Sequence, residues 1–185
     1  MTKGRGGQGV RYACSLVFPI IPLTLALYDG YDPHLMRLQL GPHTGDATKF
    51  ETFDEFFGAF RMQMRSMFEI ATRNRTKGRY MEAKYLQNVL GSCLFERCIE
   101  SGLDMVDGRA GGVSNAWITV GLAADVIDCL YSIKKLIFDE KKYTMQQLQE
   151  AIMANWVGFG EMRQEFLNVP KFGNDIDEVD QIAAD

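Results

Sequence analysis

The stretch from Asn115 to Asp177 constrains the fold most, because a strand pattern and several helical patterns follow one another in it without a long gap. β-Forming residues run from Asn115 to Val120 and predict a short strand that ends at Gly121. Apolar residues then recur at helical spacing from Ala123 to Asp139, which predicts a helix with one wide apolar face. A strand followed by helices indicates a helix-rich α/β fold.

A charged turn at Asp139–Lys142 separates this helix from the next one. Thr144 followed by Gln147 forms a capping-box pattern, which marks the start of the second helix. We expect the inner face of that helix to carry Met145, Leu148, Ile152 and Trp156. Gly158 and Gly160 then break it, and a third helix from Met162 to Asn168 stops before Pro170, which cannot continue a helix.

The composition bounds the class of protein. With 185 residues, 46% of them hydrophobic, the chain suits one domain with a core of its own. The net charge of −4 gives no electrostatic basis for binding nucleic acid, and no apolar run reaches the ~18 residues of a membrane-spanning helix. The four cysteines (Cys14, Cys93, Cys98 and Cys129) lack C-x-x-C spacing, so we interpret them as buried free thiols in a reducing cytosol.

The N-terminal region is predicted to consist of loops around one apolar segment. GRGGQG in residues 1–10 fits G-x-G-x-x-G, but no strand precedes it, so we expect a loop and no dinucleotide site. Tyr12–Asp29 is apolar and predicts a helix from about Pro22 onward, closed by Gly30; the absence of a small-residue cleavage pattern after it argues against a signal peptide. Tyr31–Pro33 predicts a turn and Gln39–Phe50 a loop. The only histidines, His34 and His43, lack ligand spacing, so we expect no metal site.

The middle of the chain is expected to be mostly helical. Thr52 and Glu55 form a second capping box, and the helix that follows carries a core stripe of Phe56, Phe57, Phe60, Met64, Met67, Phe68 and Ala71. We interpret the basic run Arg73–Arg79 as a solvated loop. Tyr85–Ser101 predicts another helix with Gly102 at its C-cap, and Asp104–Gly112 a loop. No Ser/His/Asp set or singled-out carboxylate pair appears, so the residues alone name no catalytic group.

The C-terminal third resembles the glycyl radical enzymes of the pyruvate formate-lyase and diol-dehydratase group. Matching positions follow one another in the order of the family's motifs: Asp128, Ile133–Phe138, Asn155, Gly158, Arg163, Asn168, Pro170, Lys171, Gly173, Asn174 and Asp175. Two upstream stretches, Leu25–Pro33 (LALYDGYDP) and Leu40–Asp46 (LGPHTGD), are also similar to the family. Cys129 departs from it, because the family often has Ser there.

This resemblance implies a ten-stranded α/β barrel in which a glycyl radical passes to a cysteine, whose thiyl radical abstracts a substrate hydrogen. The family's cysteine lies in a G-C-[VM] loop, which would fall just upstream of Met1, and its radical glycine in R-V-x-G-[YF], which would fall after Asp185. Cys14 is not assigned as that cysteine. We therefore expect residues 1–185 to be an internal fragment of a pyruvate formate-lyase-type domain, inactive alone, with no catalytic residue, bound cofactor or metal.

The resemblance also implies partners. A separate activase, iron–sulfur and S-adenosylmethionine-dependent, installs the radical in this family. Small accessory subunits and a homo-oligomer of the full-length protein are further expectations, with no nucleic acid and no membrane.

The residues before Asp128 bear on the subfamily. Dehydratase-type members read G-G-A-R-Y-N there, whereas this chain reads GGVSNAWITVG. That N-x-W-[IV]-T pattern is more similar to benzylsuccinate and alkylsuccinate synthases, which add a hydrocarbon to fumarate. The resemblance then implies that Arg11 grips a fumarate carboxylate bidentately, that Trp117 forms an apolar pocket wall, and that Asn115 lies near the substrate.

Each of these three residues also has an ordinary structural interpretation. Arg11 is equally well a loop arginine, Trp117 a core residue, and Asn115 a brace for the strand. Three functions remain open: a fumarate-adding synthase; another glycyl radical lyase, such as a diol dehydratase, a C–N lyase, an arylacetate decarboxylase or formate C-acetyltransferase; and a non-catalytic stand-alone domain.

Overall fold

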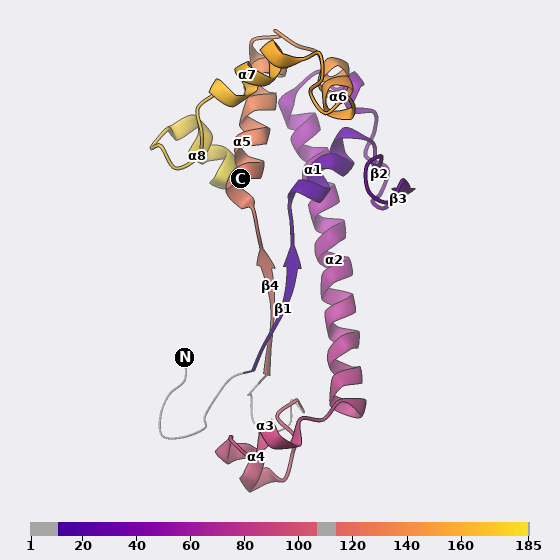
Figure 1. Ribbon diagram of the computed structural model, residues 1–185, viewed down its shortest axis with the longest axis vertical. Coiled ribbons are helices and arrows are strands. Elements are labelled where there is room, and N and C mark those ends of the chain that lie inside the picture. Colours follow the sequence, from indigo (N-terminus) through magenta and orange to yellow (C-terminus); the bar gives the residue numbers. More distant parts are fainter. Residues whose placement is uncertain (1–10, 107–113, 185) are drawn as a thin grey trace. The chain divides into compact units, whose positions relative to one another are not determined.

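The computed structural model describes residues 11–106 and 114–184, and Figure 1 shows the order of their elements. The chain forms two compact units. Unit 1 consists of Met1–Val17 and Phe68–Thr119, and unit 2 consists of Phe18–Met67 and Val120–Asp185. Unit 2 is therefore discontinuous in sequence, because the second segment of unit 1 is inserted between its two segments. Within the two described ranges, no helix is long and apolar enough to cross a membrane.

Unit 1 contains a pair of strands and several helices. Its described elements are β1 (Arg11–Val17), the C-terminal part of α2 (Phe53–Tyr85), α3 (Val89–Ser92), α4 (Glu96–Ser101) and β4 (Ser114–Val120), whose last residue belongs to unit 2. β1 and β4 are hydrogen-bonded neighbours in a two-stranded sheet. The strand expected at Asn115–Val120 is confirmed.

The apolar segment Tyr12–Asp29 holds a strand that the sequence pattern did not reveal. Its first part belongs to β1, and helix α1 (Ile20–Leu27) begins before the expected Pro22. Pro22 lies in the first turn of α1, where a missing N–H leaves no helical hydrogen bond unmade. The expected helix is therefore confirmed, with its start at Ile20 and not at Pro22.

The expectation that Arg73–Arg79 forms a loop is also wrong, because α2 continues through it to Tyr85. Arg and Lys are good helix formers, and the single Gly78 costs only ~1 kcal/mol relative to Ala. An ion pair supports this part of the helix, with the Arg75 Nη1 atom 3.6 Å from the Glu82 Oε1 atom. The run is a helical surface, and solvated as expected at most of its positions.

The single helix expected over Tyr85–Ser101 is replaced by the end of α2 and the short helices α3 and α4. The Asn88 side chain accepts a hydrogen bond from the Gly91 N–H at 2.8 Å and so caps a new helix start. Gly102 closes α4 with φ +64°, as its C-cap position predicts. The loop expected at Asp104–Gly112 is described only as far as Val106, and its remaining residues lie outside the described ranges.

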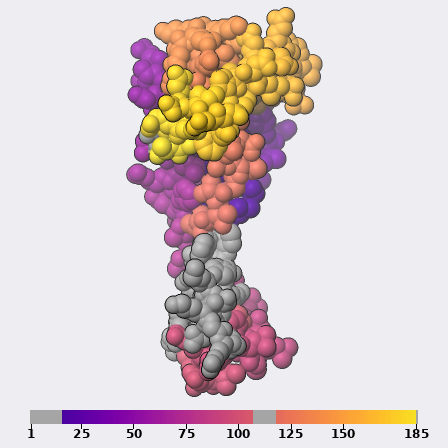
Figure 2. Space-filling model, turned by 90° about the vertical axis from the view of Figure 1, so that its left-hand side faces the viewer, coloured from indigo at the N-terminus to yellow at the C-terminus, as the bar shows by residue number. Residues whose placement is uncertain are grey.

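Unit 2 is a helical assembly around one large core. Its elements are α1, β2 (Tyr31–Asp32), β3 (Leu38–Gln39), the 3-10 helix η1 (Ala47–Lys49), the N-terminal part of α2, α5 (Ala123–Ile133), the π-helix η2 (Lys134–Asp139), α6 (Met145–Met153), α7 (Gly160–Asn168) and α8 (Asp177–Ala184). Figure 2 shows α8, in yellow, lying over one side of α5, with which it is in contact.

The core of unit 2 joins its two segments. The Phe53 and Phe56 rings of α2 lie 6.1 and 6.3 Å from the Phe138 ring of η2. Phe56 is fully buried, which confirms the expected core role of the Phe/Met stripe in its N-terminal half. The Thr52–Glu55 capping box is confirmed too, because the Glu55 N–H donates to the Thr52 hydroxyl and the Thr52 N–H donates to the Glu55 carboxylate.

The C-terminal helices largely follow the predicted pattern. The helix expected over Ala123–Asp139 has the right extent, although its last residues form η2. The Thr144–Gln147 capping box begins α6 as predicted. That helix ends at Met153, so Trp156 lies beyond it and not on its inner face, although its ring packs against the core. Helix α7 is confirmed, and α8 was not predicted.

Two aspartates organise the segment after α1. The Asp29 carboxylate accepts hydrogen bonds from the Thr44 and Gly45 N–H groups at 2.6 and 2.7 Å, and its other oxygen lies 2.9 Å from the His43 Nδ1 atom. The Asp32 carboxylate accepts from the backbone N–H groups of residues 34, 35 and 36. The expected turn at Tyr31–Pro33 is therefore a small antiparallel hairpin of β2 and β3.

Candidate functional site

The residues predicted to bind substrate lie on the paired strands of unit 1. Arg11 is the first residue of β1, and Asn115 and Trp117 belong to β4. Because β1 and β4 are neighbours in one sheet, the fold places these residues on adjacent strands. Their side chains lie outside the described part of the structure, so their roles stay predictions.

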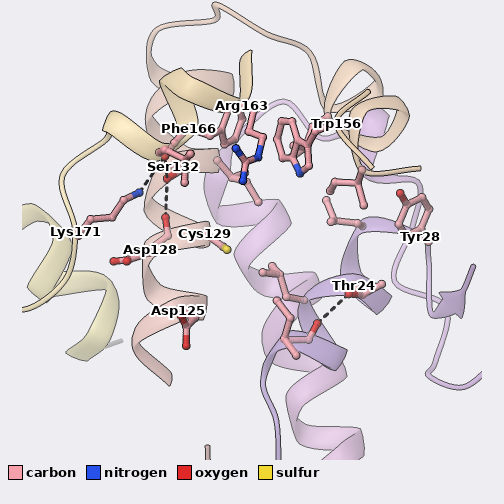
Figure 3. A pocket seen from close by; sticks show the side chains of 17 residues that line it. Thr24, Tyr28, Asp125, Asp128, Cys129, Ser132, Trp156, Arg163, Phe166 and Lys171 are labelled. Atoms are coloured by element: carbon pink, nitrogen blue, oxygen red, sulfur yellow. Dashed lines mark hydrogen bonds between the residues drawn. The ribbon is translucent and has the colours of Figure 1, made fainter. Parts of the chain in front are cut away.

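A second candidate is a groove of about 510 Å³ that lies wholly within unit 2 (Figure 3). Helices α1, α5, α6 and α7 and the turns after α6 and α7 form its walls. The lining is largely apolar, contributed by Ile20, Leu23, Leu27, Ile133, Leu148, Ile152, Trp156, Phe166 and Leu167. The polar lining residues are Thr24, Tyr28, Asp125, Asp128, Cys129, Ser132, Arg163 and Lys171.

Several polar groups of the groove are committed to holding its walls together. The Ser132 hydroxyl donates to the Asp128 carbonyl at 2.7 Å, and the Lys171 ammonium donates to the Phe166 carbonyl at 2.9 Å. The Asp128 carboxylate accepts the backbone N–H of Phe172 at 2.7 Å. The Asp128–Phe172 bond links α5 to the segment after α7, the Lys171–Phe166 bond ties that segment to α7, and the Ser132–Asp128 bond lies within α5. All three therefore serve the shape of the groove.

Trp156 is held in the wall by an unusual backbone. Asn155 and Trp156 both have left-handed φ values, 48° and 63°. Asn tolerates this region, whereas a bulky residue there carries strain on the order of 1–3 kcal/mol. The Trp156 N–H bonds to the Ala151 carbonyl at 2.8 Å, and its ring lies 5.9 Å from that of Phe166. The sharp turn thus aims the indole at the groove, as Figure 3 shows.

Arg163 is the free cation of the groove. Its side chain projects from α7 beside Trp156 (Figure 3). Within residues 11–106 and 114–184, its guanidinium has no hydrogen bond or ion pair. Five N–H donors in a rigid fork are therefore available to a carboxylate.

Two titratable groups of the groove, Cys129 and Tyr28, have raised pKa values. The expectation that the cysteines are buried is confirmed for Cys98 and wrong for Cys93 and Cys129, which are exposed. Desolvation by the surrounding protein atoms, reinforced by the charge of Asp128, raises the pKa of the Cys129 thiol. Burial likewise raises the pKa of Tyr28. Both groups therefore stay protonated at neutral pH, and a protonated thiol is a poor nucleophile. No cluster of His, Cys, Asp or Glu suited to a metal occurs among the residues that the structure describes.

Sequence reasoning did not find this groove. Asp128, Arg163 and Lys171 were matched to family motifs but received no role. The signal that could have marked the groove is the N-W pair at Asn155–Trp156, set between two helical patterns where a turn is required.

A family model described as pyruvate formate lyase-like matches residues 8–185. The chain belongs to this family of glycyl radical enzymes. The match spans most of the chain and includes both paired strands and every element of unit 2, so the α/β class expected from the sequence is confirmed.

Named relatives are similar at the level of sequence. The trans-4-hydroxy-L-proline dehydratase of Clostridioides difficile is 35% identical over 161 residues, which cover 86% of this chain and 20% of the relative. The isethionate sulfite-lyase of Bilophila wadsworthia (strain 3_1_6) is 33% identical over 159 residues, covering 85% of this chain and 19% of the relative. The chain thus spans about a fifth of the length of the curated relatives it matches.

Solved structures of glycyl radical enzymes are also similar to this chain. The hydroxyproline dehydratase from Clostridioides difficile, with trans-4-hydroxy-L-proline bound, is similar with a TM-score of 0.81 and 33% identity, covering 92% of this chain and 22% of that one. A glycyl radical enzyme from Archaeoglobus fulgidus is similar with a TM-score of 0.77 and 26% identity, covering 90% of this chain and 21% of that one. The fold is a helix-rich part of a glycyl radical enzyme barrel.

Glycyl radical enzymes use a radical stored on a backbone glycine. The 185-residue sequence contains no R-V-x-G motif and no G-C pair.

Proposed function

We propose that residues 1–185 form part of the barrel of a glycyl radical lyase that eliminates a small group from its substrate. The observation that carries this proposal is the family match over residues 8–185, together with relatives named as dehydratases and sulfite-lyases. A dehydratase breaks a C–O bond and releases water, and a sulfite-lyase breaks a C–S bond and releases sulfite. The elimination of such a leaving group is the reaction class that these relatives share.

In this proposal the β1–β4 pair carries the substrate-binding residues. The guanidinium of Arg11 binds an anionic substrate group through two parallel N–H···O bonds. Trp117 supplies an apolar wall, and Asn115 a polar contact or a brace for the strand. The neighbouring position of β1 and β4 supports this arrangement.

A second candidate is the addition of a hydrocarbon to fumarate. The pattern Asn115-Ala116-Trp117-Ile118-Thr119 favours it, because it departs from the G-G-A-R-Y-N of dehydratase-type members. Under this alternative, Arg11 binds a fumarate carboxylate and Trp117 contacts the hydrocarbon.

The proposal includes partners outside the chain. A radical S-adenosylmethionine activase would install the radical on the full-length protein. Small accessory subunits and a homo-oligomer in the cytoplasm are further parts of it.

A substrate panel distinguishes the two candidates. The full-length protein is activated anaerobically by its activase, and the glycyl radical is measured by electron paramagnetic resonance. It is then given hydroxyproline, isethionate or a vicinal diol, and separately fumarate with toluene. We expect an elimination product with one of the first three and no succinate adduct. Adduct formation would select the second candidate, and an activated protein that converts none of them would count against both.

Arg11→Ala tests the binding role directly. In the full-length protein we expect KM for an anionic substrate to rise about tenfold or more, while the glycyl radical signal is unchanged, because a lost charge-assisted contact is worth about 1.5–3 kcal/mol. Arg11→Lys keeps the charge without the planar fork and should fall in between. An unchanged KM in the alanine variant removes Arg11 from the site.

A further inference from the structure

Two cysteines of unit 1 line one cavity. Cys93 is the C-cap residue of α3, and Cys98 lies in α4, the next helix along the chain (Figure 1). The cavity has a volume of about 480 Å³ and lies wholly within unit 1. Residues of both helices and of the turns that follow them line it, among them Ser92, Gly102 and Asp104. The two thiols therefore border a common space within one local structure.

The backbone between the two cysteines is folded tightly. Cys93 and Cys98 are five positions apart, and five residues of extended chain would span about 17 Å, whereas the Cα atoms of a disulfide lie about 4.4–6.8 Å apart. Here the Phe95 N–H donates to the Ser92 carbonyl at 3.1 Å, which closes a turn around Cys93, and the Cys98 N–H donates to the Phe95 carbonyl at 3.0 Å. Two consecutive turns thus separate the cysteines, and closing so short a loop costs little entropy.

The two thiols differ in exposure. Cys93 is exposed, whereas Cys98 is only 4% exposed and packs with Met105 and Val106 in the core cluster of unit 1. Burial, reinforced by the charge of Asp104, raises the pKa of the Cys98 thiol. An oxidant dissolved in water therefore meets Cys93 first, and Cys98 reacts through a sulfur that lies beside it.

We propose that Cys93 and Cys98 form a redox-sensitive dithiol, in which a peroxide oxidises Cys93 and Cys98 then completes a disulfide. The Cys93 thiolate attacks one peroxide oxygen and the O–O bond breaks. Cys93 becomes a sulfenic acid, and the second oxygen leaves as hydroxide, which takes up the proton that Cys93 released. The Cys98 sulfur then attacks the Cys93 sulfur, the S–O bond breaks, and the hydroxyl leaves as water with the Cys98 proton. Two thiols lose two electrons, and one hydrogen peroxide becomes two waters.

This chemistry is separate from the proposed lyase reaction, because it uses no glycyl radical. Cys129 offers a matched comparison within the same chain. It is exposed like Cys93, but it is the only cysteine of unit 2 and so has no partner thiol in its own unit.

Peptide mass spectrometry tests for the disulfide. The full-length protein, before any activation, is treated with hydrogen peroxide, and the remaining thiols are blocked with N-ethylmaleimide in urea. Trypsin cleaves after Arg97, between the two cysteines, so peptides 85–97 and 98–109 stay together only if a disulfide joins them. We expect this linked pair to be at least about tenfold more abundant than any disulfide of Cys129. Dithiothreitol should separate the two peptides.

Single substitutions separate the roles of the two thiols. In Cys98→Ser we expect Cys93 to stop at the sulfenic acid, so that labelling of Cys93 by dimedone rises about tenfold over the unchanged protein. In Cys93→Ser, Cys98 should stay reduced, because its buried sulfur is not reached by the oxidant. Cys129→Ser is the control and should leave the yield of the linked pair unchanged.

Several results would overturn the proposal. Sulfinic acid at Cys93 without any linked pair would mean that Cys98 is out of reach, and a reduced Cys93 beside an oxidised Cys129 would mean that Cys93 is not the sensitive thiol. Oxidation of Cys98 at an unchanged rate in Cys93→Ser would show that Cys98 reacts with peroxide directly. Because Cys93 and Cys129 are both exposed, their variants decide the outcome even where Cys98→Ser does not fold.

Discussion

The two units differ in how much apolar surface each removes from water. Unit 2 has a continuous core of twenty buried residues, whereas the described part of unit 1 has a cluster of three, Cys98, Met105 and Val106. Unit 1 instead exposes a series of large apolar side chains: Tyr80, Met81, Tyr85, Leu86, Val89, Leu90, Leu94 and Ile99. Exposed apolar surface of this kind marks contact surfaces. The difference teaches that the large apolar core among the described residues lies in unit 2, so substitutions there should change the free energy of unfolding most.

The largest expected effect comes from the core of unit 2. Phe56→Ala should lower the free energy of unfolding by about 3–5 kcal/mol, because it leaves a cavity at a fully buried site against Phe138. Urea denaturation followed by circular dichroism measures this. A loss below about 1 kcal/mol, the typical value for any substitution, would contradict the view that this core stabilises unit 2.

A smaller loss is expected at Gly30. Its φ is +82°, and a Cβ there would collide with the Pro42 carbonyl oxygen, which is a backbone atom and cannot rotate away as a side chain could. Gly30→Ala should therefore cost about 1–3 kcal/mol. Gly58→Ala is the control: a Cβ on this α2 glycine meets nothing within 4 Å, so the variant should gain about 0.5–1 kcal/mol. Equal changes in the two midpoints of denaturation would disprove the steric account.

Asp32 gives unit 2 a dependence on pH. Hydrogen bonds from the backbone, that of Met36 foremost, hold the pKa of Asp32 below its ordinary 3.8. Because the folded pKa is lowered, the stabilisation is present above about pH 3.8 and is lost as the pH falls through the folded pKa. Asp32→Asn should cost about 1 kcal/mol at neutral pH and little at low pH. Thermal melting of the unchanged protein and of Asp32→Asn measures this at both pH values. A stability difference between the two proteins that is as large at low pH as at neutral pH would refute the role of Asp32.

The smallest effect is expected in unit 1. Leu90 is 85% exposed, so Leu90→Ser should change the free energy of unfolding by less than about 0.5 kcal/mol. It should nevertheless reduce the binding of a hydrophobic dye by the 185-residue chain, because it interrupts the exposed apolar surface. Dye fluorescence that stays constant across Leu90→Ser and Leu94→Ser would show that this surface is not what the dye binds.

Local signals in the sequence predicted much of unit 2. The Thr52–Glu55 and Thr144–Gln147 capping boxes fixed two helix starts, because each depends only on residues within one turn. The failures came where distant contacts or single side chains decide the outcome. β1 forms because β4 pairs with it across a large sequence separation, and Asn88 starts a new helix inside a continuous helical pattern.

The candidate site was less predictable. Family motifs singled out Arg163 and Lys171. Their spacing does not reveal that the Lys171 ammonium is bonded to a backbone carbonyl while the Arg163 guanidinium is free. The groove arises because α1 from one segment meets α5, α6 and α7 from the other, and no local pattern encodes that meeting. The roles of Arg11, Asn115 and Trp117 stay predictions.

The discontinuity of unit 2 has a consequence for the order in which the protein folds. During synthesis Phe56 and its neighbours leave the ribosome early, yet their partner Phe138 follows only after the inserted segment of unit 1 has been made. The hydrogen bond from the Gln149 side chain to the Leu27 carbonyl closes the same long loop. Closing it costs entropy before any core contact is made. The phenylalanines of the nascent α2 therefore stay without these core partners for that interval, and apolar surface exposed in this way is prone to aggregation.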